Sequence, residues 1–254
     1  MSEALLEIVE LNKSYGAKSA VIDLNLKVFR GEIFGMLGPN GAGKTTTFKM
    51  IAGLLKPSSG RVLVGGYDIE SQPLEAKRIQ GFVPDTPLLY DKLTAQEFLY
   101  FVADLYDVSR EQASRRAAEL LRLFDLASNR DDLIDSFSHG MKQKIALAAA
   151  LMHDPGLLIL DEPTVGLDPK SARLIKDILR QLSERGVGII LSTHILEIAE
   201  RMCDRIGIIQ AGRLIAAGSV DELRQESTAE GSLEDIFLSL TGGNEYAQIT
   251  EVLQ

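Results

Sequence analysis

The sequence of 254 residues has no tryptophan, one cysteine and no long hydrophobic run. A single cysteine excludes an internal disulfide. Cys203 also lacks the spacing to other cysteines or histidines that a metal site needs, so we expect a small core residue there. The longest apolar stretches, 145–152 and 157–160, are separated by the segment His-Asp-Pro-Gly and are too short to span a bilayer. The sequence therefore predicts no membrane-spanning segment.

The sequence also lacks a signal-peptide pattern and an excess of positive charge. Its first residues include acids and alternate apolar with polar side chains, which predicts a cytoplasmic protein. The balance of 27 basic against 36 acidic residues gives a net charge of −9, and this argues against nucleic acid as the main partner. An anionic triphosphate remains compatible, because backbone N–H groups and one lysine can hold it locally.

The composition is that of an ordinary globular protein, with 45% apolar and 25% charged residues. The chain is long enough for one large α/β domain, or for a core domain with a smaller satellite domain. The first thirty residues alternate in polarity around a turn at 14–18, which predicts antiparallel strands. Residues 32–37 form a short apolar run typical of a buried parallel strand, and we expect a helix at about 44–55 to follow it.

Residues 94–135 have helical periodicity and predict an all-helical insertion. Thr94 with Glu97, and Ser109 with Gln112, have the spacing of capping boxes at two helix starts. One apolar face is predicted for each helix. The residues of these faces are Phe98, Val102 and Leu105 in the first helix, and Ala113, Ala117, Leu120 and Phe124 in the second.

The later part of the chain predicts a β-α-β unit. Two strand-like segments, 157–162 and 186–193, flank a helix that Asp168 and Pro169 begin. Residues 205–218 read as a hairpin, and capped helices are expected at 219–223 and 232–240.

Residues 38–45, GPNGAGKT, fit the phosphate-binding pattern G-x-x-x-x-G-K-[ST] between a predicted strand and a predicted helix. Glycines let backbone N–H groups approach phosphates, and the helix N-terminus adds its dipole. Lys44 would reach the β and γ phosphates, and Thr45 would ligate Mg²⁺. The residues expected to bind the triphosphate are Gly38, Pro39, Asn40, Gly41, Ala42, Gly43, Lys44, Thr45 and Thr46.

Two acids end the apolar strand at 157–162, where the carboxyl edge of an open α/β sheet binds ligands. Asp161 is predicted to help hold Mg²⁺. Glu162 is predicted to orient and deprotonate the attacking water, with Mg²⁺ and Lys44 neutralising charge. These residues predict hydrolysis of a nucleoside triphosphate.

Four further motifs agree in order and spacing with one family: Tyr15, FSHGMKQK at 137–144, GLD at 166–168 and STH at 192–194. With the phosphate loop, they make the chain resemble the ATP-binding cassette ATPase subunit of ABC transporters over nearly its whole length. The resemblance implies an α/β fold with a P-loop NTPase core of mixed sheet, an N-terminal antiparallel β-subdomain and an all-helical signature subdomain.

The resemblance also implies domain limits. The ATPase core would comprise 1–92 and 136–220. The helical subdomain would comprise 93–135 and extend into a signature helix at 136–152, and a C-terminal helical tail would follow at 221–254.

Roles for individual residues follow from the same resemblance. Tyr15 would stack on adenine, His194 would be the switch histidine and Asp168 would belong to the D-loop. Two subunits, in a homodimer, would sandwich two ATP molecules with Mg²⁺. Each signature would contact the ATP held by the other subunit, and its residues are Ser138, His139, Gly140 and Met141.

A membrane partner is implied as well. An integral membrane permease would contact the segment 85–93 and would place the chain at the cytoplasmic face of the cell membrane. The segment SLEDIFLSLTG at 232–242 resembles the tails of exporter-type subunits and favours export over import. The transported substrate is not encoded in this chain, because the family's transport pathway lies in the partner.

The chain departs from the family pattern at two positions. Asp85 replaces the usual glutamine, and its carboxylate would ligate Mg²⁺ directly, whereas an amide can also donate to water. His139 replaces the first glycine of the signature, while the backbone donor of Gly140 remains.

Two alternative functions are less compatible with the sequence. A soluble cassette ATPase of DNA repair or translation would carry a long coiled-coil insertion or two fused cassettes, and neither occurs in this sequence. A P-loop GTPase would carry an N-K-x-D motif, which is absent, and a small-molecule kinase is disfavoured because the acid pair at 161–162 suits attack by water.

Overall fold

The computed structural model of the chain describes residues 4–226 and 233–241, and its strands form two sheets. In the four-stranded sheet all neighbours are antiparallel, in the order β2-β1-β4-β5. Its strands are β1 (Ala4–Tyr15), β2 (Lys18–Phe29), β4 (Ser59–Val64) and β5 (Tyr67–Asp68). The antiparallel strands predicted for the first thirty residues are confirmed.

The six-stranded sheet has the order β10-β9-β3-β8-β7-β6, with parallel neighbours except for the hairpin β9-β10. Its strands are β3 (Ile33–Leu37), β6 (Gln80–Val83), β7 (Leu157–Asp161), β8 (Gly188–Thr193), β9 (Arg205–Gln210) and β10 (Arg213–Gly218). The sheet is mixed, as the predicted fold requires. The predicted β-α-β unit is present as β7, α6 (Pro169–Glu184) and β8.

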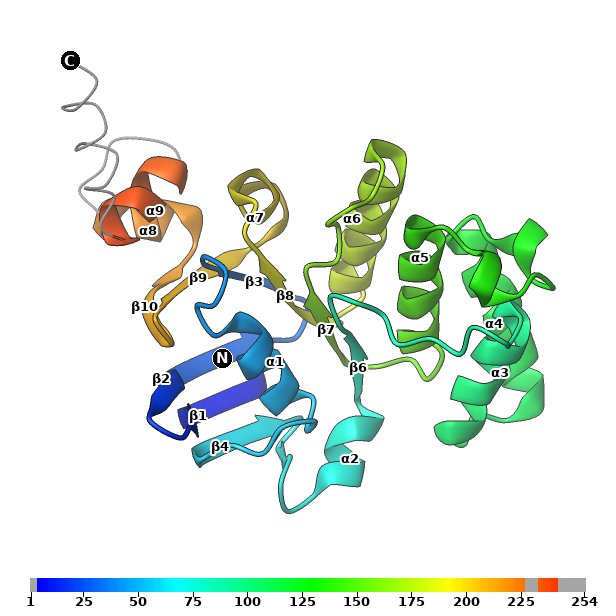
Figure 1. The fold of residues 1–254 in the computed structure, drawn as a ribbon, viewed down its shortest axis with the longest axis horizontal. Coiled ribbons are helices and arrows are strands. Elements are labelled where there is room, and N and C mark those ends of the chain that lie inside the picture. Colours follow the sequence, from blue (N-terminus) through cyan, green and yellow to red (C-terminus); the bar gives the residue numbers. More distant parts are fainter. Residues whose placement is uncertain (1–3, 227–232, 242–254) are drawn as a thin grey trace.

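Hydrophobic side chains cover both faces of this larger sheet. Along β3, Ile33 and Leu37 point into one apolar cluster, while Phe34 and Met36 point into the other. Figure 1 shows α1 (Lys44–Ile51) between the two sheets. On the opposite face lie α5 (His139–Ala150), α6 and α7 (Leu196–Met202). Burial on both faces explains why β3 reads as a continuous apolar run.

Helix α1 is shorter than the sequence suggested. It was expected to run to about residue 55, but it ends at Ile51. Gly53 has φ +65°, a left-handed conformation that glycine adopts without strain and that ends a helix. Lys44, the second-to-last residue of the phosphate-binding consensus, is the first residue of this helix.

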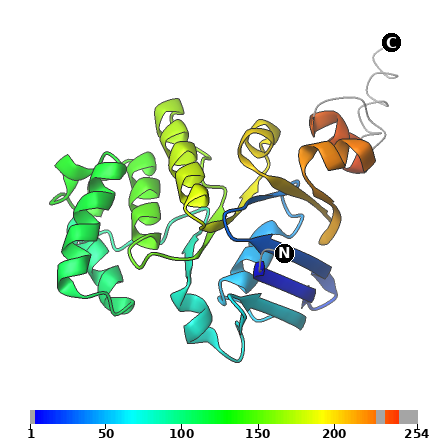
Figure 2. The same ribbon diagram turned by 180° about the vertical axis from the view of Figure 1, so that it is seen from behind.

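A group of helices occupies one end of the molecule in both views (Figures 1 and 2). They are α3 (Ala95–Leu105), α4 (Arg110–Leu123) and the short 3-10 turns η1 (Ala127–Asn129) and η2 (Ile134–Ser136). Thr94 forms the predicted capping box with Glu97. The predicted buried face of α3 is wrong at Leu105, whose side chain is 65% exposed because α3 ends there, beyond its packing partners.

The C-terminal helices lie at the other end, beside β9 and β10 (Figure 2). They are α8 (Val220–Glu226) and α9 (Leu233–Thr241). Ser219 and Glu222 bond reciprocally at the start of α8, and this confirms the predicted cap. Ser232, Gly242 and the remainder of the predicted tail to 254 lie outside the described residues.

The remaining short helix, α2 (Pro73–Arg78), precedes β6. Within the part of the chain that the structure describes, none of the helices combines the length and hydrophobicity that a bilayer span requires. Cys203 is buried, as expected of a small core residue.

Candidate functional site

The glycine-rich loop lies where the sequence placed it, between β3 and α1. Gly43 is the N-cap of α1 with φ +112°, and the helix has no side-chain cap. A Cβ atom at Gly43 would lie 2.5 Å from the carbonyl oxygen of Ala20, and one at Gly38 would collide with the carbonyl of Ile209. Glycine is therefore required at both positions, and the first N–H groups of α1 remain for a ligand.

The loop forms the base of an open cleft of about 540 Å³. The cleft brings together four predicted features: Tyr15, most of the loop, Asp85 and Glu162. Its lining residues are Tyr15, Lys18, Ser19, Ala20, Asn40, Gly41, Ala42, Gly43, Lys44, Thr45, Thr46, Asp85, Glu162, Ala211 and Gly212. Of the predicted loop residues, Gly38 and Pro39 do not line the cleft.

Lys44 is a buried cation at the end of the cleft, with only 6% of its surface exposed. Its Nζ donates to the carbonyl oxygens of Gly38 at 2.6 Å and Pro39 at 3.2 Å. Burial lowers the pKa of Lys44, while the negative charges of Glu162 and Asp161 act in the opposite direction. The site thus concentrates a positive charge beside two carboxylates.

Glu162 lies between this cation and a histidine. Its Oε1 accepts a hydrogen bond from Nδ1 of His194 at 2.9 Å and lies 3.9 Å from Nζ of Lys44. Its Oε2 is buried and has no hydrogen-bond partner in the structure. The residue has φ +51°, a left-handed conformation that costs energy for a side chain other than glycine. Such local strain is typical of functional sites.

Asp161 does not line the cleft. It is 1% exposed and lies beneath it, at the end of β7. The hydroxyl of Ser192 donates to Oδ1 of Asp161 at 2.5 Å and accepts a hydrogen bond from the N–H of Glu162 at 2.9 Å. Ser192 therefore fixes both acids relative to the neighbouring strand β8.

Tyr15 also lines the cleft and is the last residue of β1. Its side chain is 52% exposed, and Nζ of Lys13 lies 5.2 Å from the ring centroid. Asp85 follows β6 and is exposed at the cleft. An exposed aromatic ring on one side and a buried cation on the other match a ligand with a flat base and a charged end.

The predicted signature residues lie elsewhere. Ser138 caps α5, where its hydroxyl accepts from the N–H of Met141 at 3.3 Å, and none of the residues 138–141 lines the cleft. Asp168 caps α6 by accepting a hydrogen bond from the N–H of Ser171 at 3.0 Å. Hydrogen bonds from the side chain and the backbone of Ser171 lower the pKa of Asp168. Within one chain, these residues are separate from the cleft.

Sequence reasoning missed five lining residues of the cleft. Three lie at the start of β2, and two form the turn of the hairpin β9-β10. The N–H of Gly212 donates to the carbonyl of Ala42 at 2.9 Å, which attaches this turn to the loop. The hairpin itself was predicted, but no local motif signals that its turn contacts residues 170 positions earlier in the chain. The missed residues are Lys18, Ser19, Ala20, Ala211 and Gly212.

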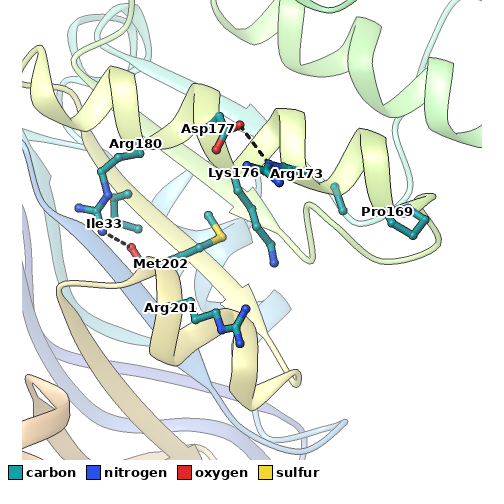
Figure 3. Close-up of a pocket in the computed structure, with 9 residues that line it drawn as sticks. Ile33, Pro169, Arg173, Lys176, Asp177, Arg180, Arg201 and Met202 are labelled. Carbon is teal, nitrogen blue, oxygen red and sulfur yellow. Dashed lines mark hydrogen bonds and ion pairs between the residues drawn. The ribbon is translucent and has the colours of Figure 1, made fainter.

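A second hollow, of about 530 Å³, lies between α6 and α7 (Figure 3). Lys176 and Arg201 extend into it from the two helices, and Met202 lies between them. None of the predicted site residues lines it. Among the described residues, no group of three or more histidines, cysteines, aspartates or glutamates is placed to hold a metal ion.

Comparison with known proteins agrees with this geometry. The family model described as ABC transporter matches residues 21–165. The chain is 44% identical over 241 residues to the linearmycin resistance ATP-binding protein LnrL of Bacillus subtilis, covering 95% of this chain and 76% of that protein.

Two solved structures are also similar. One, described as an ATP-binding subunit of an ABC transporter, has a TM-score of 0.88 and 38% identity, covering 93% of this chain and 99% of the other. The second is cbiO1 of Clostridium perfringens, described as part of the ABC transporter complex cbiONQ, with a TM-score of 0.78 and 31% identity over 88% of this chain and 92% of the other. The chain therefore belongs to the ABC transporter family as an ATP-binding subunit, and this family hydrolyses ATP to power transport.

Proposed function

We propose that this subunit hydrolyses Mg²⁺-bound ATP in the cleft between Tyr15 and Glu162, as one of two identical copies that energise a membrane exporter. The observation that carries the proposal is the convergence of three side chains from distant segments. Oε1 of Glu162 lies 3.9 Å from Nζ of Lys44 and 2.9 Å from Nδ1 of His194. A cation, a carboxylate and an orienting imidazole suit the hydrolysis of a phosphoanhydride by water.

Binding would use the loop and the exposed ring. The backbone N–H groups at the start of α1, together with the helix dipole, would bind phosphate oxygens, and Tyr15 would stack on the base. Nζ of Lys44 now donates to carbonyl oxygens within the loop. Phosphate oxygens would be stronger, charged acceptors for the same donor, so ligand binding would redirect it.

Glu162 would act as the general base. Its Oε1 is bonded to His194, and its unpartnered Oε2 would accept a proton from a water that enters beside this buried atom. Nδ1 of His194 donates to Glu162 and so fixes the direction of the carboxylate. His194 is 47% exposed at its side chain, so the rest of its ring remains accessible to the γ-phosphate.

The residues around the loop also fit a magnesium ion. Thr45, Asp161 and Asp85 would supply oxygen ligands, the donor type that Mg²⁺ prefers. Mg²⁺ is usually held by one or two protein carboxylates together with substrate phosphates. When bound, the ion would neutralise negative charge on the phosphates. Ser192 would keep Asp161 oriented for this task.

A second copy would complete the site. Ser138, His139, Gly140 and Met141 do not line their own cleft, so within the proposal the backbone N–H groups of this segment contact the ATP of the other copy, with Asp168 beside them. The proposed division is an ATPase core at 1–92 and 136–220, a helical subdomain at 93–135 that continues into 136–152, and a tail at 221–254.

The membrane permease would dock on an apolar groove of about 210 Å³ beside α3. Leu88 and Leu105 line it and are 87% and 65% exposed, respectively. Exposed leucines at a groove are typical of an interaction surface, and this one adjoins Asp85 through the segment 85–93. Such docking would hold the subunit peripherally at the cytoplasmic face of the membrane. The resistance function in the name of the B. subtilis relative favours export.

Replacement of the proposed base tests this function. The Glu162→Gln variant should bind ATP but hydrolyse it at a rate lower by a factor of roughly 100 or more, since general bases contribute about that much. It should also form an ATP-dependent dimer, measured by light scattering. Glu184→Gln, at the exposed end of α6, is the control and should behave like the unmodified protein. Steady-state hydrolysis close to normal in Glu162→Gln would disprove the role of Glu162.

A further inference from the structure

The side chain of His139 lies against its own chain at a position where the resemblance leads us to expect glycine. His139 is the first residue of α5, directly after the cap Ser138. Its Nε2 lies 3.4 Å from the carbonyl oxygen of Val165. Because a carbonyl oxygen only accepts, this nitrogen must carry the proton and donate.

The imidazole ring also packs against Gly166. A Cβ atom at Gly166 would lie 3.1 Å from Nε2 and 3.2 Å from Cδ2 of His139. Gly166 has φ +73°, so glycine is favoured there by its backbone conformation as well as by the close approach of the ring. The ring and the turn at Gly166 are therefore in direct contact.

Two more contacts join the same face of α5 to the same segment. Nε2 of Gln143 donates to the carbonyl of Pro163 at 3.5 Å. Gly140 faces Leu167, since a Cβ atom there would lie 3.6 Å from Cδ2 of that leucine. Residues 139, 140 and 143 lie on one side of the helix, and their four contacts cover the segment from 163 to 167.

We infer that His139 is a positioning residue, which attaches the segment 163–168 to the start of α5. This segment begins directly after Glu162 and ends at Asp168. A glycine at 139 could make neither the hydrogen bond nor the ring contact. The consequence for ATP turnover rests on the proposed function. The attachment keeps a fixed separation between Glu162, which serves one ATP site, and the signature N–H groups, which serve the other ATP site.

The structural part of the inference is tested without nucleotide. In His139→Ala, amide hydrogens of residues 164–168 should exchange about five-fold faster, the ratio expected from a neutral hydrogen bond. His139→Gln keeps an N–H donor on a side chain of similar length and should restore slow exchange. Exchange in α4 should be unchanged in both variants, which excludes global destabilisation. Unchanged exchange at 164–168 in His139→Ala overturns the inference.

The functional part is tested by steady-state ATP hydrolysis. In His139→Ala, kcat should also fall about five-fold while KM for ATP stays constant, and His139→Gln should recover kcat. A raised KM with a constant kcat would instead make the imidazole a direct contact of the partner's ATP, and this overturns the positioning role. If Glu162→Gln still hydrolyses ATP, the proposed function fails, whereas the exchange result stands or falls independently.

Discussion

Removal of one buried hydroxyl should weaken both the fold and the catalytic site. Ser192 is completely buried on β8, and its hydroxyl joins the carboxylate of Asp161 to the N–H of Glu162. Ser192→Ala deletes both hydrogen bonds without adding volume. The carboxylate and the N–H are left in a region where water does not replace the lost partner.

The expected cost follows from these two bonds. A hydrogen bond to a charged group contributes roughly 1.5–3 kcal/mol, and a buried N–H left without an acceptor costs roughly 1–3 kcal/mol. Since the two effects overlap at one site, we expect the free energy of unfolding to fall by about 2–4 kcal/mol. The strained conformation of Glu162, with φ +51°, should also relax, because its N–H is no longer held.

Urea unfolding and steady-state ATP hydrolysis are the two assays. The matched control is Ser183→Ala, another buried serine, whose hydroxyl donates to the carbonyl of Gly31 at 2.9 Å and lies outside the cleft. This control should lose only about 1 kcal/mol of stability and keep its kcat. If Ser192→Ala matches the control in both assays, Ser192 does not organise the two acids.

Three further predictions concern separate parts of the molecule. Lys44→Ala should weaken ATP binding by a factor of roughly ten or more, because a charge-assisted donor is lost, and unaltered affinity in calorimetry would count against the loop assignment. Asp85→Gln should keep ATP affinity in EDTA but raise the Mg²⁺ concentration needed for half-maximal hydrolysis by about tenfold, and identical Mg²⁺ titrations would refute direct ligation. Burial raises the pKa of Cys203 to about 12, so iodoacetamide at pH 8 should label the thiol in urea and leave the native protein unlabelled; rapid native labelling would contradict its burial.

Local patterns predicted the parts of the site that depend on neighbouring residues. The phosphate loop, the cap at Thr94 and the acids at the end of β7 each follow from a few consecutive residues, and the structure places them accordingly. The alternation and the apolar runs likewise predicted which strands are antiparallel and which are buried.

Other features depend on contacts between distant segments, which the sequence does not reveal. The turn at 211–212 reaches the loop only because β9 pairs beside β3 in the larger sheet. Leu105 continues the apolar period of α3, but the helix ends without a neighbour to cover it. The left-handed backbone at Glu162 has no signature in its residue type, because an isolated glutamate does not favour that conformation.

This last feature links the site to the proposed dimer. Glu162 turns the chain sharply as it leaves β7, so its carboxylate meets Lys44 and His194 while the following residues run toward α5. There His139 and Gln143 bind the carbonyls of Val165 and Pro163. A rearrangement at either end of the segment 163–168 must therefore strain its other end or break these two hydrogen bonds. In a dimer whose two sites exchange signatures, that short segment is the physical connection through which hydrolysis at one ATP would alter contacts to the second.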